Sequence, residues 1–427
     1  MKGKKMGLTS KILLGLLFGL ITGLILNTIG PSYFRDTVLV SNLFTLFGGI
    51  FINAIKMLVV PLVFISIVNG AASVSDIRKL GRMGVKTLGF YLATTAIAIT
   101  IAILLSMVVQ PGIGLDMSSL AKTEPKIAEA KSFVQILIDM VPTNPVASLT
   151  SGDMLQIIVY ALLVGVALAA IKSKVKGVLE LFEQLNELMM KIVDFVMYIA
   201  PVGVFCLIAK TFTGLGFSAM APLIKYMFCV LFALLLHAVF TYGGMLTVFT
   251  RLNPVQFVKK FWPAMGVAFS TSSSNATLPV TLETTEKGLG VNKSIASFTI
   301  PLGATINMDG TAIMQGAATI FISQLYGIPL SFTAILTVIA TATLASIGTA
   351  GVPGVGLVML SMVLQAVGLP VEGIAIIIGI DRILDMCRTV INITGDAVCT
   401  VIVAKSEGEF DQEIYNSKAV KTEGLSA

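Results

Sequence analysis

One short segment of this otherwise apolar chain carries five charged side chains and an asparagine. The segment is 381–396, "DRILDMCRTVINITGD". Its polar residues are spaced four, three, four and four positions apart: Asp381, Asp385, Arg388, Asn392 and Asp396. At ~100° per residue, this spacing places them within roughly 80° of one face of a helix. Acids, an arginine and an amide on one face can bind ions or a charged solute.

These charges are costly inside a membrane. Insertion scales give ~2.5–3.5 kcal/mol for each central charge, so five of them, counting Arg382, cost on the order of 12–17 kcal/mol. A structural ion-pair ladder accounts for one or two such residues. Because intramembrane charges generally mark ion or substrate pathways, the whole stripe favours a transport site, with Arg382 at its side as a supporting residue.

The composition predicts a multi-pass, all-α membrane protein. Of 427 residues, 56% are hydrophobic and only 12% are charged, whereas a soluble domain carries about 25% charged residues. The mean hydropathy is +0.93. Six apolar runs are long enough to span a bilayer, and they are 12–29, 45–68, 84–109, 154–171, 189–212 and 223–249.

The placement of basic residues predicts the topology. Lysines and arginines cluster before the first run, between the second and third, between the fourth and fifth, and after the sixth. This positive-inside pattern puts both termini in the cytoplasm. It also explains the net charge of +6 without a nucleic-acid partner, so membrane lipid is the expected surrounding. The first run lacks a small-residue cleavage site and is expected to be a retained helix.

The histidine and cysteine content excludes several functions. His237 is the single histidine, and the four cysteines are scattered in apolar runs. Most histidine-based catalysis and metal clusters are therefore excluded. We expect His237 to pack in a core or face an interface.

Two elements in the second half are too short to span. An arm of about ten apolar residues, 261–270, leads into a serine-rich tip, "STSSSNAT", and a second arm follows. A second such element has an arm over 332–345, a glycine-rich break and another arm to Leu369. Ten helical residues rise ~15 Å, half of the ~30 Å hydrocarbon core. We therefore expect two re-entrant hairpins that enter from opposite faces, which is an inverted repeat.

Between the hairpins, a helix is interrupted at "GATINMDGTA". Backbone groups freed at a break inside a membrane must be satisfied by protein, water or ligand, so such breaks line cavities. Asn307, Asp309 and the freed carbonyls are hard oxygen ligands suited to alkali cations. The serine-rich tip offers hydroxyls and N–H groups at a half-helix N-terminus, which suit a carboxylate.

The motifs "TSSSNATLPVT", "NMDGTA", "IGTAGVPGVG" and "DMCRTVINITGD" resemble those of the glutamate transporter family, the dicarboxylate/amino acid:cation symporters. The resemblance covers essentially the whole chain. It implies a prokaryotic homotrimer in the plasma membrane, with eight transmembrane helices and two re-entrant hairpins that work as an elevator. The implied scaffold is 1–80 and 111–216, the transport domain is 81–110 and 217–405, and 406–427 is a cytoplasmic tail.

The resemblance also implies a substrate site. Asp385 would hold the substrate amine, and Arg388 would pair bidentately with the side-chain carboxylate. The full implied set is Ser272, Ser273, Ser274, Thr311, Val352, Gly356, Asp385, Arg388, Thr389 and Asn392.

Three sodium sites are implied in the same way. The first comprises Gly303, Asn307, Asn392 and Asp396. The second comprises Thr305, Ser346, Ile347 and Thr349. The third comprises Tyr91, Thr94, Thr95, Asn307 and Asp309.

Two departures from the family pattern matter. Archaeal relatives carry an arginine where Ser272 stands, whereas this chain has Arg382 on the last helix. We expect Arg382 either to reach Asp385 or the hairpin tip, or to pair locally with Asp381 or extend to water. Gln315 stands where animal members have a proton-carrying glutamate, which weakens the case for proton coupling.

These observations predict a secondary active symporter that imports L-aspartate or L-glutamate with sodium ions, and not an enzyme. Carriers of C4-dicarboxylates or neutral amino acids, and a proton-coupled glutamate symporter, are the alternatives within the family. Asp385 argues against the first and Arg388 against the second. An intramembrane aspartyl protease needs two acids on facing helices with no arginine between them, and an ion channel would pass sodium without substrate.

The amine contact can be tested at Asp385. Asp385→Asn removes the negative partner of the ammonium, so amino acid binding should weaken by far more than tenfold, as for loss of a buried charged hydrogen bond. Equilibrium binding of aspartate measures this. Succinate, which lacks an amine, should bind the wild type poorly, and tight succinate binding would instead favour the dicarboxylate alternative.

Overall fold

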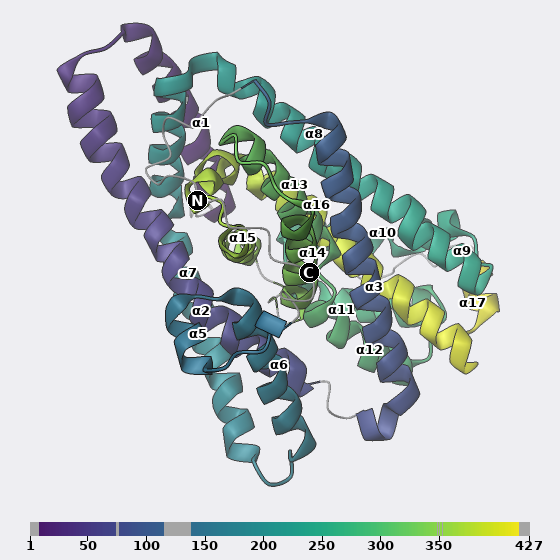
Figure 1. The fold of residues 1–427 in the computed structure, drawn as a ribbon. Helices are drawn as coiled ribbons and strands as arrows, with labels where there is room; N and C mark the ends of the chain where they lie inside the picture. Colours follow the sequence, from purple (N-terminus) through teal and green to yellow (C-terminus); the bar gives the residue numbers. More distant parts are fainter. Residues whose placement is uncertain are drawn as a thin grey trace, which may run out of the picture.

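The protein, represented by a computed structural model, is almost entirely helical (Figure 1). The structure describes residues 8–73, 77–114, 138–347, 349, 351 and 353–417. Within these ranges the one β-type pairing is an isolated bridge between Val291 and Phe410. The expected all-α class is confirmed.

The described part of the first half consists mainly of long helices. All six predicted apolar runs are helical, although α7 begins well before its predicted run. Its first turns contain Glu180, Glu183 and Glu187, which lower the local hydropathy without interrupting the helix. The elements are α1 (Leu8–Ile29), a π-helix (Phe34–Phe44), α2 (Thr45–Ser73), α3 (Ile77–Val109), α5 (Pro145–Ser151), α6 (Met154–Ala170) and α7 (Lys176–Leu215).

The second half is more fragmented. The sixth predicted run is divided by a π-helical stretch that hydropathy does not reveal. The elements are a 3-10 turn (Gly216–Ala219), α8 (Met220–Leu236), a π-helix (His237–Gly243), α9 (Gly244–Thr250), α10 (Pro254–Thr271), α11 (Ser274–Glu283), a π-helix (Thr284–Gly288), α12 (Lys293–Ile306), α13 (Asp309–Leu325), α14 (Phe332–Ser346), α15 (Val355–Ala366), a 3-10 turn (Val371–Gly373), α16 (Ile374–Glu407) and α17 (Gln412–Asn416).

The predicted helix breaks lie where the sequence places them. α12 ends at Ile306 and α13 begins at Asp309, so the break falls within "INMD". At the first tip, Ser272 adopts a left-handed conformation (φ 51°) that ends α10, and the Ser273 hydroxyl caps α11 by accepting from the Ala276 N–H. α10 begins at Pro254, earlier than the predicted arm, because Asn253 caps it there.

Five helical stretches of the described residues are long and apolar enough to cross a membrane. They are Ser10–Ile29, Phe34–Asn69, Met83–Val109, Lys176–Gly214 and Met220–Thr250. The fourth predicted run forms α6, which has 17 residues. At 1.5 Å per residue α6 spans about 25 Å, slightly less than a hydrocarbon core of ~30 Å. The count of eight spanning helices stays a prediction.

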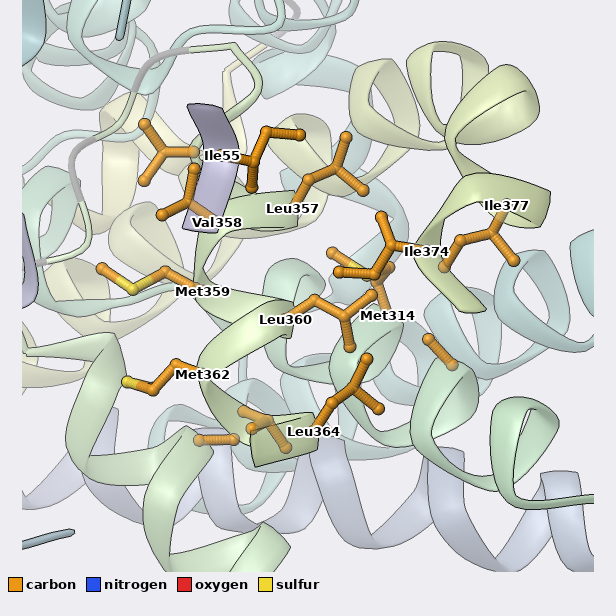
Figure 2. Packing of buried hydrophobic residues seen from close by; sticks show 14 of the residues in the cluster. Ile55, Met314, Leu357, Val358, Met359, Leu360, Met362, Leu364, Ile374 and Ile377 are labelled. Atoms are coloured by element: carbon orange, nitrogen blue, oxygen red, sulfur yellow. The ribbon is translucent and has the colours of Figure 1, made fainter. Parts of the chain in front are cut away.

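The long helices α1, α2 and α7 pack together along one side of the molecule (Figure 1). α15 lies in the interior, between these helices and the C-terminal elements. Figure 2 shows its Leu357, Met359 and Leu360 among Ile55 of α2 and Met314 of α13, with the first turn of α16 beside them. The second break region is therefore held by a core that joins both halves of the chain.

The C-terminal segment is tied to the base of the first hairpin. The buried Lys260 Nζ of α10 donates to the carbonyl oxygens of Gly288, at 3.1 Å, and Ile414. The Tyr415 hydroxyl donates to the Asn253 carbonyl oxygen at 3.0 Å. The Asp411 N–H donates to the Gly290 carbonyl oxygen at 2.8 Å. Both arms of the hairpin are thus fixed at the end opposite its tip.

This attachment can be tested by adding a methyl group at Gly290. A Cβ there would contact the carbonyl oxygen of Asp411, and the residue has a φ of 78°. Gly408 has a similar φ of 76° and nothing within 4 Å of a Cβ. Left-handed strain costs each alanine variant ~1–2 kcal/mol. Gly290→Ala should therefore lower the Tm in detergent more than Gly408→Ala does, and equal shifts would contradict the described packing.

Candidate functional site

The polar stripe lies on one helix, as predicted, and is buried. α16 carries all five residues in its middle, and none is more than 8% exposed. Arg388 is completely buried and is among the largest fully buried side chains. A buried guanidinium is stable only with acidic partners and hydrogen bonds close by.

Those partners come from the same helix. Arg388 Nη1 lies 2.5 Å from Asp381 Oδ1, and Arg388 Nη2 lies 2.8 Å from Asp385 Oδ1. The other oxygen of Asp385 lies 3.5 Å from Arg382 Nη1. Two acids and two arginines therefore alternate in a chain of ion pairs. The pairing of Arg382 with Asp385 is one of the two arrangements expected from the sequence, whereas the pairing of Asp381 with Arg388 was not foreseen.

Glycines let two further helices approach Arg388. A Cβ on Gly356 of α15 would lie 3.3 Å from Arg388 Nη2 and 3.4 Å from Thr311 Cγ2. A Cβ on Gly310 of α13 would lie 2.5 Å from the Arg388 carbonyl oxygen. Gly356 thus lies against the guanidinium, and Thr311 lies against Gly356. Their roles in holding the substrate stay predictions. Thr389 is buried, and its hydroxyl donates to the Asp385 carbonyl oxygen at 2.9 Å.

The tip between α10 and α11 contacts Gly351, which lies between α14 and α15. The Gly351 carbonyl oxygen accepts from the Ser273 hydroxyl at 2.7 Å and from the Asn275 N–H at 3.2 Å. Ser272 and Ser274 are buried at the same tip. The Ser272 hydroxyl has no hydrogen-bond partner within the described part of the chain. Val352 lies outside the described residues.

Three residues of the second implied sodium site lie at or just after the end of α14, and the fourth lies on α12. Ser346, Ile347 and Thr349 are buried, and Thr305 of α12 is half-buried. A Cβ on the neighbouring Gly351 would lie 3.0 Å from the Ala304 carbonyl oxygen, so this segment approaches the end of α12.

The break between α12 and α13 is held against α16. The Asn307 amide nitrogen donates to the Asn392 carbonyl oxygen at 3.0 Å and to Asp396 Oδ1 at 2.9 Å. The Asn392 side-chain oxygen accepts from the Gly310 N–H at 2.8 Å. A Cβ on Gly303 would contact Asp396 Oδ1. The residues of the first implied sodium site are therefore adjacent.

A second buried acid lies at the same break. Asp309 Oδ1 accepts from the Thr95 hydroxyl at 2.5 Å. Its Oδ2 accepts from the Tyr242 hydroxyl at 2.8 Å and lies 3.0 Å from His237 Nε2. The Tyr91 carbonyl oxygen accepts from the Thr94 hydroxyl at 3.2 Å and lies 2.8 Å from the Thr95 hydroxyl oxygen. Tyr91, Thr94, Thr95 and Asp309 of the third implied sodium site are therefore linked by contacts, and His237 and Tyr242 are two additional contacts of Asp309. Sodium binding at these residues stays a prediction.

Sequence reasoning did not identify these two additional residues. They lie 72 and 67 positions from Asp309, and no motif links them. The available signal was the presence of a lone histidine in an apolar run.

The chemistry of this region fits alkali cations. Asn307 Oδ1 is buried and has no hydrogen-bond partner among the residues described. In the same part of the chain, no lysine or arginine pairs with Asp309 or Asp396. The described residues also contain no group of three or more histidines, cysteines and acids that suits a transition metal. Isolated carboxylates with amide and carbonyl oxygens are instead ligands for hard ions.

Comparisons with known proteins show that the chain is similar to membrane symporters. The model of the sodium:dicarboxylate symporter family matches residues 8–406. The chain is 38% identical over 419 residues to the proton/sodium-glutamate symport protein of Bacillus caldotenax, covering 96% of this chain and 97% of that protein. It is 39% identical to the proton/glutamate-aspartate symporter of Escherichia coli K12, with 97% and 96% covered. The C4-dicarboxylate transport protein of Bacillus subtilis is 32% identical, with 95% and 94% covered.

The buried ion pairs of α16 can be tested through Asp381. Asp381→Asn leaves the buried Arg388 with one carboxylate fewer, and breaking a buried pair costs ~3–5 kcal/mol. A large fall in Tm is expected. Asp194→Asn is the control, because the Lys191–Asp194 pair is about 60% exposed on both sides and such pairs contribute ~0–1 kcal/mol. Similar Tm changes in both variants would show that the Asp381 contact does not stabilise the fold.

Proposed function

Since this chain belongs to the sodium:dicarboxylate symporter family, we propose that it imports L-aspartate and L-glutamate together with sodium ions. The family consists of secondary transporters, so the protein is a transporter and not an enzyme. The curated relatives include proton/sodium-glutamate, glutamate-aspartate and C4-dicarboxylate transporters, so the substrate and the coupling ion are argued from the site.

The observation that carries the proposal is the contact between Arg388 and Asp385. These side chains pair at 2.8 Å, in a buried place that Gly356 and Thr311 also approach. An acidic amino acid offers both complementary charges: its side-chain carboxylate matches the guanidinium, and its ammonium matches the carboxylate. When the substrate binds, Arg388 and Asp385 would each replace their mutual contact with a contact to the substrate. Ser272, Ser273, Ser274, Val352, Thr389 and Asn392 complete the proposed substrate set.

A C4-dicarboxylate is the second candidate, and Arg382 favours it. Arg382 lies near one oxygen of Asp385, and Arg388 lies near the other. These two guanidinium groups could hold the two carboxylates of such a substrate. A dicarboxylate would, however, face Asp385 with no ammonium to compensate. We therefore propose that Arg382 orients Asp385 toward the substrate amine.

Sodium coupling is supported by the two buried acids at the helix break. Asp309 and Asp396 have no lysine or arginine partner among the described residues. Burying such charges is unfavourable unless a cation compensates. We propose the three implied oxygen-lined sites as the places where sodium binds. Reciprocal linkage then makes substrate affinity rise with sodium.

The proposed mechanism uses an elevator in a homotrimer. The transport domain would comprise 81–110 and 217–405, the scaffold 1–80 and 111–216, and the cytoplasmic tail 406–427. Eight helices would span the plasma membrane, α10–α11 and α14–α15 would be re-entrant hairpins, and both termini would be cytoplasmic. The Lys56–Glu372 ion pair, at 2.8 Å with both side chains partly exposed, would join the two units near the outer surface and would break when the transport domain moves.

Uptake into proteoliposomes tests the proposal. A sodium gradient imposed alone should drive accumulation of labelled aspartate, and a proton gradient alone should not. Accumulation driven only by protons would contradict sodium coupling. In the same vesicles, unlabelled glutamate should compete with aspartate and succinate should compete weakly. Stronger competition by succinate would support the dicarboxylate candidate.

A further inference from the structure

His237 and Tyr242 hold the same oxygen of Asp309 from one turn of a π-helix. In a regular α-helix, residues five positions apart differ by about 140° and cannot converge on one atom. The π-helical turn His237–Gly243, with its i→i+5 bonds, brings them to one side. Their rings pack edge to face with centroids 4.5 Å apart. Both side chains are buried and contact Asp309 Oδ2.

The two oxygens of Asp309 have different partners. Oδ1 faces Thr95, whose hydroxyl also lies 2.8 Å from the Tyr91 carbonyl oxygen. A threonine hydroxyl carries one hydrogen, so it cannot donate to both acceptors at once. Oδ2 instead faces a tyrosine hydroxyl and an imidazole nitrogen. Oδ2 is the fixed oxygen, and Oδ1 is the oxygen left available to a cation.

We infer that His237 is a positioning residue, which donates from Nε2 to Asp309 Oδ2 and directs Oδ1 toward the cation site with Thr95. This inference rests on the proposed sodium coupling. His237 Nδ1 is buried and has no partner among the described residues, so a hydrogen on Nε2 alone leaves no buried donor unsatisfied.

A neutral donor suits this role better than a basic side chain. Lysine or arginine would hold the carboxylate equally well but would cancel its charge, leaving little attraction for a monovalent ion. Imidazole and phenol groups hold the oxygen and leave the charge in place. Residues that orient a metal ligand typically change metal affinity by ~10–100-fold when they are removed.

The test compares two replacements of His237 in the purified full-length protein. His237→Leu removes the donor, whereas His237→Gln keeps an N–H donor that does not titrate. Aspartate binding is measured at fixed pH over a range of sodium concentrations. We expect the leucine variant to raise the half-saturating sodium concentration by ~10–100-fold, while aspartate affinity at saturating sodium stays close to that of the wild type. The glutamine variant should restore most of the sodium affinity.

Tyr242→Phe serves as a milder second variant, because it removes only one hydroxyl from the same oxygen. It should shift the sodium dependence in the same direction by a smaller factor. Tyr415→Phe is the matched control: it removes a buried tyrosine hydroxyl bonded to the Asn253 carbonyl oxygen, far from Asp309 in the sequence. Its sodium dependence should equal that of the wild type.

The outcomes separate the inference from the proposed function. If wild-type affinity rises with sodium but the leucine and Tyr242→Phe variants keep the wild-type sodium dependence, His237 does not position Asp309. A glutamine variant as weak toward sodium as the leucine variant would overturn the donor role. Wild-type affinity that ignores sodium would overturn the coupling itself and, with it, this inference.

Discussion

The fully buried charge of Arg388 is the constraint on which the site's architecture depends. In an apolar interior this guanidinium is tolerated only with neighbouring acids, and Asp381 and Asp385 provide them from the same helix. The surrounding helices must then approach without adding bulk, so glycines stand at positions 310 and 356. The same arrangement leaves a carboxylate and a guanidinium side by side, which an acidic amino acid can match with its two opposite charges.

A second, similar constraint operates at the break between α12 and α13. Interrupting the helix frees backbone groups, and Asn307 and Asn392 satisfy part of them. Asp309 and Asp396 remain as buried acids without a lysine or arginine paired to them among the described residues. Asp396 belongs to the stripe on α16, and Asp309 directly precedes Gly310, whose N–H donates to Asn392 of the stripe. Cations that compensate the two acids would therefore also organise the residues proposed to hold the substrate. This proximity is the physical basis of the proposed coupling between ions and substrate.

The sequence predicted the features that follow from local patterns. The spacing of polar residues in α16 gave the correct buried face. Serine, asparagine and glycine in apolar runs correctly marked the breaks at Ser272, at Asn307 and between α14 and α15. Contacts between distant residues were not predictable in this way. The pairing of Asp381 with Arg388 depends on side-chain rotamers, and the π-helical turn that brings His237 and Tyr242 to Asp309 leaves no mark in hydropathy. Val352 lies outside the described residues, so its predicted role stays a prediction.

We propose that an acidic amino acid and sodium cross the membrane together through one site. The most direct measurement is the entry of radioactive sodium into proteoliposomes with and without external aspartate. We expect sodium entry to require aspartate and to stay proportional to the aspartate taken up. Sodium entry that is equal without aspartate, as in a channel, or aspartate entry that carries no sodium, would contradict it.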